Sequence, residues 1–293
     1  PPVIQKIEQE EALVFYPVRG MRVKHFGELC LLAAHAPPQA RFAVALRSGS
    51  EEPAFIHDDW VRFAEDQNLP IEFDVVGMRP DSFVEWLERS THLVTTSISE
   101  GFGLTFLDPA FLTKPLIGRD LPEITRDFVD YGTLYQKIPV SLDLLNGLEE
   151  EYRKKLSATM SAYGRDLDCA ELGQAWAEFS AEGTVDFGNL PETFQRKVIS
   201  EVHLPEFSSW LENALRQKPR KVDTTPWTLA SYAKKLESVI NALEAPAQVT
   251  WIPPRRILDQ FLTTDKFHFL RSRLTLSDNQ STTASWQLAR ALH

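Results

Sequence analysis

The stretch "SISEGFGLTFLDPAFLTKPLI", residues 97–117, places an acid and a Gly-x-Gly turn between a run of β-formers and an apolar, helix-like segment. The run before the turn, "HLVTTSI" at residues 92–98, is typical of a buried strand. Gly101 and Gly103 let the backbone turn sharply and approach a ligand closely. A helix that starts near Gly103 would offer unpaired amides and the positive end of its dipole to an anion such as a diphosphate. The stretch therefore predicts an anion-binding turn at the carboxyl end of a strand.

Two carboxylates flank this turn. Glu100 comes directly before the first glycine, and Asp108 follows eight residues later, on the second turn of the predicted helix. Carboxylates repel a phosphate but accept hydrogen bonds from sugar hydroxyls. The two acids and the turn together predict a pocket for a ligand with a phosphate and hydroxyl-rich groups. The alternative is a plain strand-to-helix connection, in which the glycines serve only the turn and the acids are solvated.

The sequence around this stretch, from about residue 12 to 140, alternates β-rich runs with amphipathic segments. The β-rich runs are "ALVFYPV", "RFAVALRS", "IEFDVVG", "HLVTTSI", "PLIG" and "LYQKIPV". Such alternation predicts right-handed βαβ crossovers and an α/β fold, with a mostly parallel sheet and helices on both faces. Ligands of such sheets bind at the carboxyl ends of the strands, which is where the Gly-x-Gly turn falls.

The second half of the chain has a different pattern. After about residue 141 the β-rich runs fade, and "LDLLNGLEEEYRKKLSATMSAY" at residues 142–163 carries Leu and Tyr at helical spacings. Later segments such as "PEFSSWLENALRQ" and "TLASYAKKLESVINAL" show the same spacing, and "KPRKVDTTP" is the best linker candidate. We therefore expect two domains, an α/β domain over residues 1–141 and a helical extension over residues 142–293.

Composition and charge restrict the class of protein. The chain has 293 residues, 43% hydrophobic and 11% aromatic, and no run approaches the roughly 18 apolar residues that a membrane span requires. Its net charge of -10 works against binding to nucleic acid or to an anionic membrane surface, since both rely on clustered Lys and Arg. Cys30 and Cys169 are the two cysteines and lie in helical patterns, which predicts reduced, buried thiols. Reduced thiols predict a cytoplasmic protein, and the first residues have neither the basic start nor the apolar stretch of a signal peptide.

The motif "HDDW" at residues 57–60 contains residue types that bind metal ions. It also fits the start of a helix, with Asp58 or Asp59 near the N-cap, and we favour this interpretation. The seven histidines show no paired ligand spacing. We therefore expect no metal site.

The opening stretch resembles the signature of the retaining, nucleotide-sugar-dependent glycosyltransferases of family four, which have the B-type fold. In that signature Ser, two residues and Glu-Gly-Phe-Gly-Leu lead to a second acid and then to a Pro-Val-Ile-like strand. A second element, "FYPVRGMRVKHFGELCLLA" at residues 15–33, is similar to the first strand of the family's carboxyl-terminal domain. The resemblance covers about residues 12 to 140 and implies that this part is the Rossmann-like donor half of a B-type glycosyltransferase.

The resemblance implies a role for each matching residue. Arg19 and Lys24 would neutralise the diphosphate of the donor and Glu100 would hold hydroxyls of the donor sugar, which makes these three the catalytic candidates. Backbone amides of the turn would line the sugar phosphate, and Asp108 would hold the ribose. The turn consists of Gly101, Phe102, Gly103 and Leu104. The family implies no metal and no cofactor other than the nucleoside-diphosphate sugar, which is the donor substrate.

The sequence departs from the family signature at Asp108 and at Thr113. The second acid is Asp108 where the family usually has Glu, so the ribose contact is altered or mediated by water. Thr113 stands in the place of a customary Gly before Pro115, which leaves the turn into the next strand open. The segment "GRDLPEITRDF" is similar to the family's following loop, and its Glu123 is a further pocket candidate, with a structural role at a helix start as the alternative.

The resemblance also implies a partner domain. A B-type glycosyltransferase has two facing Rossmann-like domains, and the amino-terminal one, which supplies the acceptor contacts, would end before this sequence begins. The expected function is therefore the donor-binding part of a retaining glycosyltransferase that moves a hexosyl unit from a nucleoside-diphosphate sugar to an acceptor hydroxyl, inactive without its acceptor domain. The alternative is a non-catalytic nucleotide-sugar-binding or assembly module with the helical half as its interaction surface. The sequence names neither the base, the sugar nor the acceptor.

Overall fold

The structure is a computed structural model that describes residues 12–49, 51–77, 81–101, 104–128 and 131–242. These residues divide into two compact units. The sheet unit comprises residues 12–138 and 195–242, and the small unit comprises residues 139–194.

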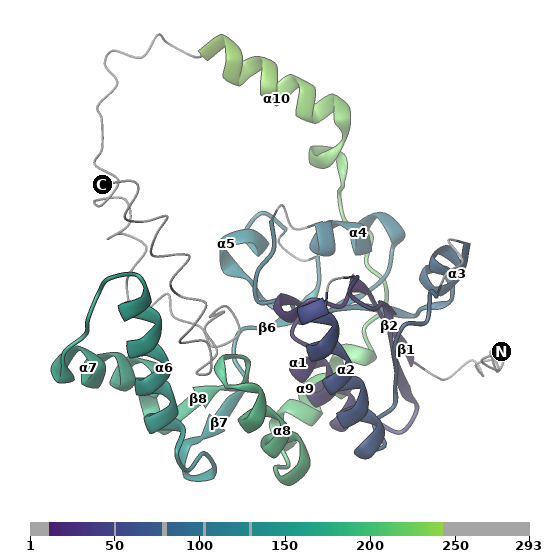
Figure 1. The fold of residues 1–293 in the computed structure, drawn as a ribbon. Helices are drawn as coiled ribbons and strands as arrows, with labels where there is room; N and C mark the ends of the chain where they lie inside the picture. The colour runs from purple at the N-terminus through teal and green to yellow at the C-terminus, as the bar shows by residue number, and fades with distance from the viewer. Residues whose placement is uncertain (1–11, 50, 78–80, 102–103, 129–130, 243–293) are drawn as a thin grey trace. The chain divides into compact units, whose positions relative to one another are not determined.

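A parallel sheet of six strands forms the centre of the sheet unit (Figure 1). The strands are β1 (Ala12–Arg19), β2 (Ala40–Leu46), β3 (Ile71–Glu72), β4 (His92–Thr95), β5 (Leu116–Arg119) and β6 (Thr133–Tyr135). Their order across the sheet is β3-β2-β1-β4-β5-β6, and every neighbouring pair is parallel. The predicted α/β fold is confirmed. The order reverses direction between β1 and β4, so this sheet has its topological switch point between those two strands.

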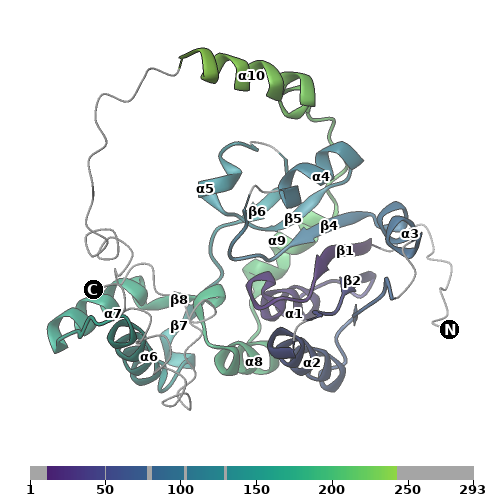
Figure 2. The same ribbon diagram turned by 45° about the horizontal axis from the view of Figure 1, so that its top comes forward.

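Helices cover both faces of this sheet, as predicted. They are η1 (Arg22–Lys24), α1 (Phe26–Ala34), α2 (Glu51–Asp66), α3 (Asp81–Arg89), α4 (Leu104–Leu112) and α5 (Pro122–Thr125). Phe15 of β1 packs against Phe83 and Trp86 of α3, with ring centroids 5.9 and 6.1 Å apart. Its neighbour Tyr16, which points to the opposite face, is also fully buried. Figure 2 shows α4 and α5 on one side of the sheet and α1 and α2 on the other.

Residues 195–242 belong to the sheet unit, although the sequence patterns had placed them in the helical extension. They contain most of α8 (Glu192–Glu201), then α9 (Pro205–Leu215), η5 (Thr225–Trp227) and α10 (Leu229–Ala242). Phe207 and Trp210 of α9 pack on Tyr135 of β6, and Trp227 stacks on Phe128 with ring centroids 4.7 Å apart. The chain thus returns to the sheet after it has formed the small unit.

The small unit is built from two short strands and two helices. Its main elements are β7 (Pro139–Ser141), α6 (Leu148–Ala162), α7 (Cys169–Phe179) and β8 (Thr184–Asp186), with short 3-10 turns at η2 (Leu142–Leu144), η3 (Ala181–Gly183) and η4 (Phe187–Asn189). Strands β7 and β8 are antiparallel. Tyr152, Leu156 and Met160 of α6 are buried against α7, which begins with a capping box formed by Asp168 and Glu171. The helical pattern read from residues 142–163 is therefore the packed face of α6.

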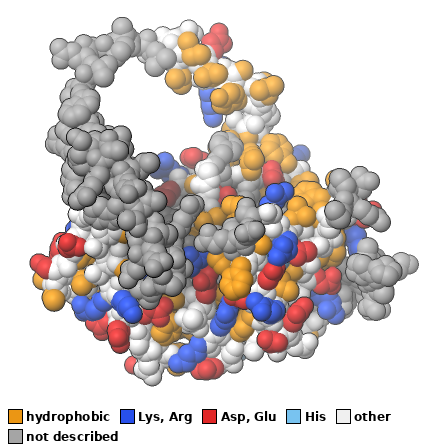
Figure 3. Space-filling model, in the orientation of Figure 1, with side chains coloured by type: hydrophobic (Ala, Val, Ile, Leu, Met, Phe, Trp, Pro, Cys, Tyr) orange, Lys and Arg blue, Asp and Glu red, His pale blue; other side chains and the backbone are white. Residues whose placement is uncertain are grey.

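Helix α10 exposes a row of large apolar side chains, which Figure 3 shows along its length. The row consists of Leu229, Tyr232, Leu236, Val239 and Ile240. Among the described residues, no helix has the length and apolar character needed to cross a membrane.

The structure corrects the expectations for the cysteines and for the "HDDW" motif. Cys30 is buried in α1, but Cys169 is exposed at the first position of α7, so the expected burial is wrong for Cys169; both thiols are free. The interpretation of "HDDW" as a helix start is also wrong, because α2 begins at Glu51 and the motif lies in its middle.

Candidate functional site

The loops that follow β1 and β4 leave the sheet at its switch point. Parallel strands present their carboxyl ends at one edge, and loops from neighbouring strands that diverge there leave a crevice between them. The loop after β1 contains η1, and the turn after β4 contains Glu100. The topology therefore brings together two segments about 80 residues apart in sequence.

Lys24 and Glu100 form an ion pair that joins these two loops. The Lys24 ammonium Nζ lies 2.5 Å from Glu100 Oε1, and the two side chains are 15% and 12% exposed. The Thr105 hydroxyl of α4 donates to the same Glu100 oxygen at 3.4 Å. An ammonium carries three N–H donors, so Lys24 can hold Glu100 and still donate to a ligand.

The backbone of the η1 loop is bonded to the turn after β4. The Ile98 amide donates to the Val23 carbonyl at 3.0 Å. Two hydroxyls donate to the Lys24 carbonyl oxygen, Tyr16 Oη at 3.1 Å and Thr96 Oγ1 at 2.8 Å. Burial raises the pKa of Tyr16 to about 12, so its phenol keeps its proton and stays a donor at neutral pH. Lys24 is thus fixed at its main chain as well as at its side chain.

The other catalytic candidate, Arg19, ends β1 and is exposed. Within the described part of the chain, no ion pair or hydrogen bond links its side chain to Lys24 or Glu100. The structure pairs Lys24 with Glu100, and Arg19 lies at the end of β1, at the same edge of the sheet.

The residues predicted to line the ligand fall on α4, on α5 and on the turn. Gly101 and Leu104 are exposed at the two ends of the turn, whereas Phe102 and Gly103 lie outside the described residues. Asp108 is exposed on the second turn of α4, and partial desolvation raises the pKa of its carboxyl.

Glu123 is exposed in the first turn of α5. Among the described contacts, neither Glu123 nor Asp108 touches Lys24 or Glu100. The proposed roles of these acids remain predictions.

The sequence patterns did not predict a buried charge that lies four residues after Lys24. Glu28 of α1 is 0% exposed, and Arg119 at the end of β5 donates from Nε to both Glu28 oxygens at 2.7 and 2.9 Å. Tyr135 donates to Glu28 at 3.1 Å, and His25 Nδ1 lies 3.5 Å away. Burial alone would raise the pKa of Glu28, but the nearby charges of Arg119 and His25 lower it to about 2. The only sequence signal was an acid inside the otherwise apolar run "FGELCLLAA".

His57 of the "HDDW" motif is buried and serves packing. Its ring lies edge-on to Phe26 and Phe73, its Nε2 lies 3.3 Å from Asp74 Oδ1, and a Cβ added to Gly20 would press on it. In the portion of the chain that the structure describes, no three His, Cys, Asp or Glu side chains are grouped so as to hold a metal ion.

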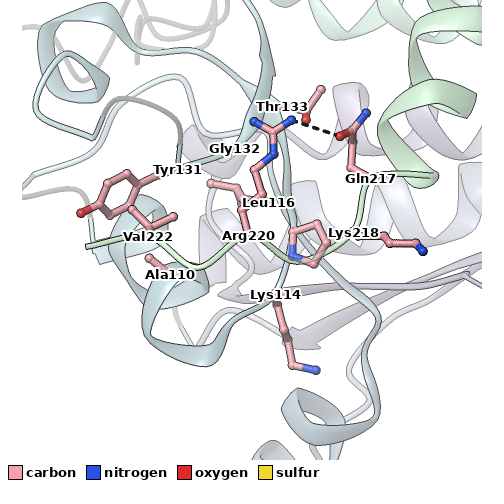
Figure 4. A pocket seen from close by; sticks show the side chains of 11 residues that line it. Ala110, Lys114, Leu116, Tyr131, Gly132, Thr133, Gln217, Lys218, Arg220 and Val222 are labelled. Atoms are coloured by element: carbon pink, nitrogen blue, oxygen red, sulfur yellow. Dashed lines mark hydrogen bonds between the residues drawn. The ribbon is translucent and has the colours of Figure 1, made fainter. Parts of the chain in front are cut away.

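A small cavity lies at the opposite edge of the sheet (Figure 4). Its lining includes Leu116 and Thr133 at the amino ends of β5 and β6, together with Lys114, Gln217 and Arg220. Its volume of about 30 Å³ has room for a water molecule but not for a nucleotide. This cavity is therefore separate from the candidate site.

No protein-family model matches the chain, and a search of curated proteins finds no match. Among solved structures, the chain is similar to the C-terminal domain of LpcC, a glycosyl transferase group 1 family protein from Francisella tularensis, with 16% identity and a TM-score of 0.33 over 38% of this chain and 58% of that one. It is also similar to TarM of S. aureus, with 15% identity and a TM-score of 0.39 over 81% of this chain and 38% of that one. A third similar structure is the pneumococcal O-GlcNAc transferase GtfA in complex with UDP and GlcNAc, with 16% identity and a TM-score of 0.36 over 80% of this chain and 36% of that one.

The chain thus covers less than two thirds of the length of each of these proteins. The likeness is distant and decides nothing about the chemistry of this chain.

Proposed function

We propose that the sheet unit binds a nucleoside-diphosphate sugar and that the protein is a glycosyltransferase of the retaining type, which moves a hexosyl unit to an acceptor hydroxyl. The observation that carries this proposal is the meeting of Lys24 and Glu100 at the switch point of the sheet. A lone ion pair is common on protein surfaces. This pair is largely buried and lies at the carboxyl ends of the strands of a doubly wound sheet, close to the start of a helix, where such folds bind phosphorylated ligands.

Each group has a distinct task in this proposal. The Lys24 ammonium binds the diphosphate, and Arg19 reaches it from the end of β1. As the bond to the sugar breaks, negative charge grows on the departing diphosphate, and fixed cations and amides stabilise that charge. Glu100 accepts hydrogen bonds from the sugar hydroxyls, and Asp108 accepts them from the ribose.

The ion pair explains how a carboxylate and a phosphate can share one site. Two anions repel each other, and a cation between them offsets the repulsion. Lys24 Nζ already touches Glu100, so a phosphate that bound to the free N–H donors of Lys24 would lie on the far side of the ammonium from the carboxylate. The donor would then bind to Lys24 without breaking the ion pair between Lys24 and Glu100.

We further propose that residues 1–293 bind the donor but do not transfer its sugar efficiently. Catalysis requires that donor and acceptor are held together in the reactive geometry. The family resemblance assigns the acceptor contacts to a second domain of the same kind. Transfer from UDP-glucose to an acceptor at a rate typical of enzymes, by these residues alone, would contradict this part of the proposal.

The proposal is tested by isothermal titration of the chain with UDP, GDP and ADP. At least one should bind, and Lys24→Met should weaken its binding by about 1.5–3 kcal/mol, because a hydrogen bond to a charged group is lost. Lys154→Met is the matched control, since Lys154 is an exposed lysine on α6 of the small unit. Equal affinities of the Lys24 variant and the wild type would remove Lys24 from the site, and no binding of any nucleotide at millimolar concentration would refute the proposal.

A further inference from the structure

We infer that Tyr16 and Thr96 are positioning residues, whose hydroxyls hold the main chain of Lys24 so that its ammonium is presented to the diphosphate. This inference rests on the proposed function and extends it to two residues that do not touch the ligand themselves.

Both hydroxyls donate to one atom, the Lys24 carbonyl oxygen, at 3.1 Å from Tyr16 and 2.8 Å from Thr96. A carbonyl oxygen has two lone pairs, so these two bonds complete its capacity. Tyr16 belongs to β1, and Thr96 directly follows β4. The two strands that border the switch point therefore each send one hydroxyl to the backbone of the same lysine.

The Tyr16 hydroxyl also joins the two strand ends to each other. It has one proton, which it gives to Lys24, so it must accept the bonds that join it to Ser97 Oγ at 2.9 Å and to the Thr96 amide at 3.3 Å. Tyr16, Thr96 and Ser97 are each 1% exposed or less. A buried hydroxyl that makes three such bonds is costly to remove and leaves little freedom to the groups that it joins.

The next residue shows why Lys24 needs support. His25 has φ 52° and ψ 65°, in the left-handed region that a non-glycine residue adopts at a cost of about 1–2 kcal/mol. The chain turns there from η1 into α1, with Lys24 as the last residue of η1. A long, flexible lysine side chain on an unfixed turn would spread its ammonium over many positions. The bonds to its carbonyl fix the base of that side chain next to Glu100.

The inference separates Tyr16 from a residue that only fills the core. Tyr16→Phe keeps the ring and removes the hydroxyl, and Thr96→Val keeps the shape and removes the other donor. If both act through Lys24, each should weaken UDP binding about 5- to 20-fold in the wild-type chain and leave it unchanged in a chain that already carries Lys24→Met. An NMR titration measures the millimolar dissociation constants that this comparison needs.

Tyr152→Phe is the matched control. Tyr152 is a buried tyrosine of the small unit that donates to the Ala175 carbonyl at 3.3 Å, so its variant also loses a buried tyrosine hydrogen bond, far from Lys24 in sequence. It should lower the melting temperature and leave the UDP dissociation constant unchanged. Unchanged UDP affinity in Tyr16→Phe and Thr96→Val, or an equal loss with and without Lys24→Met, would overturn the inference.

A measurement without ligand keeps this test separate from the proposed function. A water-soluble carbodiimide joins a carboxylate and an amine in contact as an amide, and mass spectrometry gives the yield of the Lys24–Glu100 cross-link. We expect at least a threefold lower yield in Tyr16→Phe and Thr96→Val than in the wild type, and no change in Tyr152→Phe. If the wild type bound no nucleotide, the proposed function would fail, and this yield would still decide the inference: equal yields in all four chains would overturn it.

Discussion

Removal of the Arg119 guanidinium should destabilise the sheet unit strongly, because it would leave the Glu28 carboxylate buried without its main partner. Glu28 is 0% exposed, and Arg119 donates to both of its oxygens. The pair joins α1, which begins two residues after Lys24, to the end of β5. The perturbation is Arg119→Met, which keeps most of the side-chain volume and removes the charge.

The burial of the pair and its remaining partners determine the expected loss of stability. Loss of one partner of a buried ion pair costs about 3–5 kcal/mol, since the remaining charge is neither hydrated nor compensated. Tyr135 still donates to Glu28 at 3.1 Å in the variant and His25 Nδ1 still lies 3.5 Å from it, so we expect a loss near the lower end, about 3 kcal/mol. A double variant, Glu28→Met with Arg119→Met, removes both charges and should recover most of that loss, because well-packed apolar residues often replace a buried pair at little cost.

Urea unfolding of the wild type and the two variants, followed by circular dichroism and tryptophan fluorescence, measures these differences. The key comparison is between the single and the double variant, since both lack the arginine and only the single one retains a buried carboxylate. A single variant less than about 1 kcal/mol below the wild type, or a double variant as unstable as the single one, would refute the reasoning.

The same carboxylate predicts a pH dependence. Its pKa is lowered from 4.5 to about 2 in the folded chain. A group whose folded pKa lies below its unfolded value contributes stability that is fully present above the unfolded pKa and is lost as the pH falls toward the folded pKa. The free energy of unfolding should therefore fall between pH 4.5 and pH 2, by about 3 kcal/mol from this group. Glu28→Gln should flatten that slope; an equally steep slope in this variant would assign the acid sensitivity to other groups.

Two substitutions test the backbone around α4 and β5. Thr113 has φ 52° and is exposed. Thr113→Gly should raise the free energy of unfolding by about 0.5–1 kcal/mol, because the relief of left-handed strain exceeds the entropy cost of glycine by about that amount. A loss of stability would contradict this. Gly118 has φ 141°, and a Cβ there would collide with the Thr95 carbonyl, so Gly118→Ala should cost about 3 kcal/mol or more; a melting temperature within 2 °C of the wild type, about 0.5 kcal/mol, would contradict it.

Much of the sheet unit could be predicted from the sequence, because strands and helices each impose their own spacing of hydrophobic residues along the chain. Alternation of β-rich and amphipathic runs predicted the parallel sheet, and the quoted stretch placed a turn after β4. The turn before Pro115, which the sequence left open, has a left-handed backbone at Thr113. The order of the strands in the sheet could not be predicted from the alternation of strands and helices alone, because each crossover can place the next strand on either side of the strands already formed.

Long-range packing accounts for what was missed. The helical spacing of apolar residues in α9 predicts that this helix has an apolar face, but it does not identify Tyr135 of β6 as the residue that packs on it. The return of residues 195–242 to the sheet was therefore not predicted. The start of α2 was placed too late, although Pro53 in its first turn was an available signal. Tyr16 and Thr96 read as ordinary strand residues, since nothing local shows that their hydroxyls reach the backbone of Lys24.

The most direct test of the donor site is a crystal structure of the chain grown with UDP. We predict that the diphosphate lies within hydrogen-bonding distance of Lys24 Nζ, at the carboxyl ends of β1 and β4, with Glu100 still paired to the same ammonium. UDP bound instead at the opposite edge of the sheet, near Lys114 and Arg220, or a diphosphate without contact to Lys24, would contradict the account.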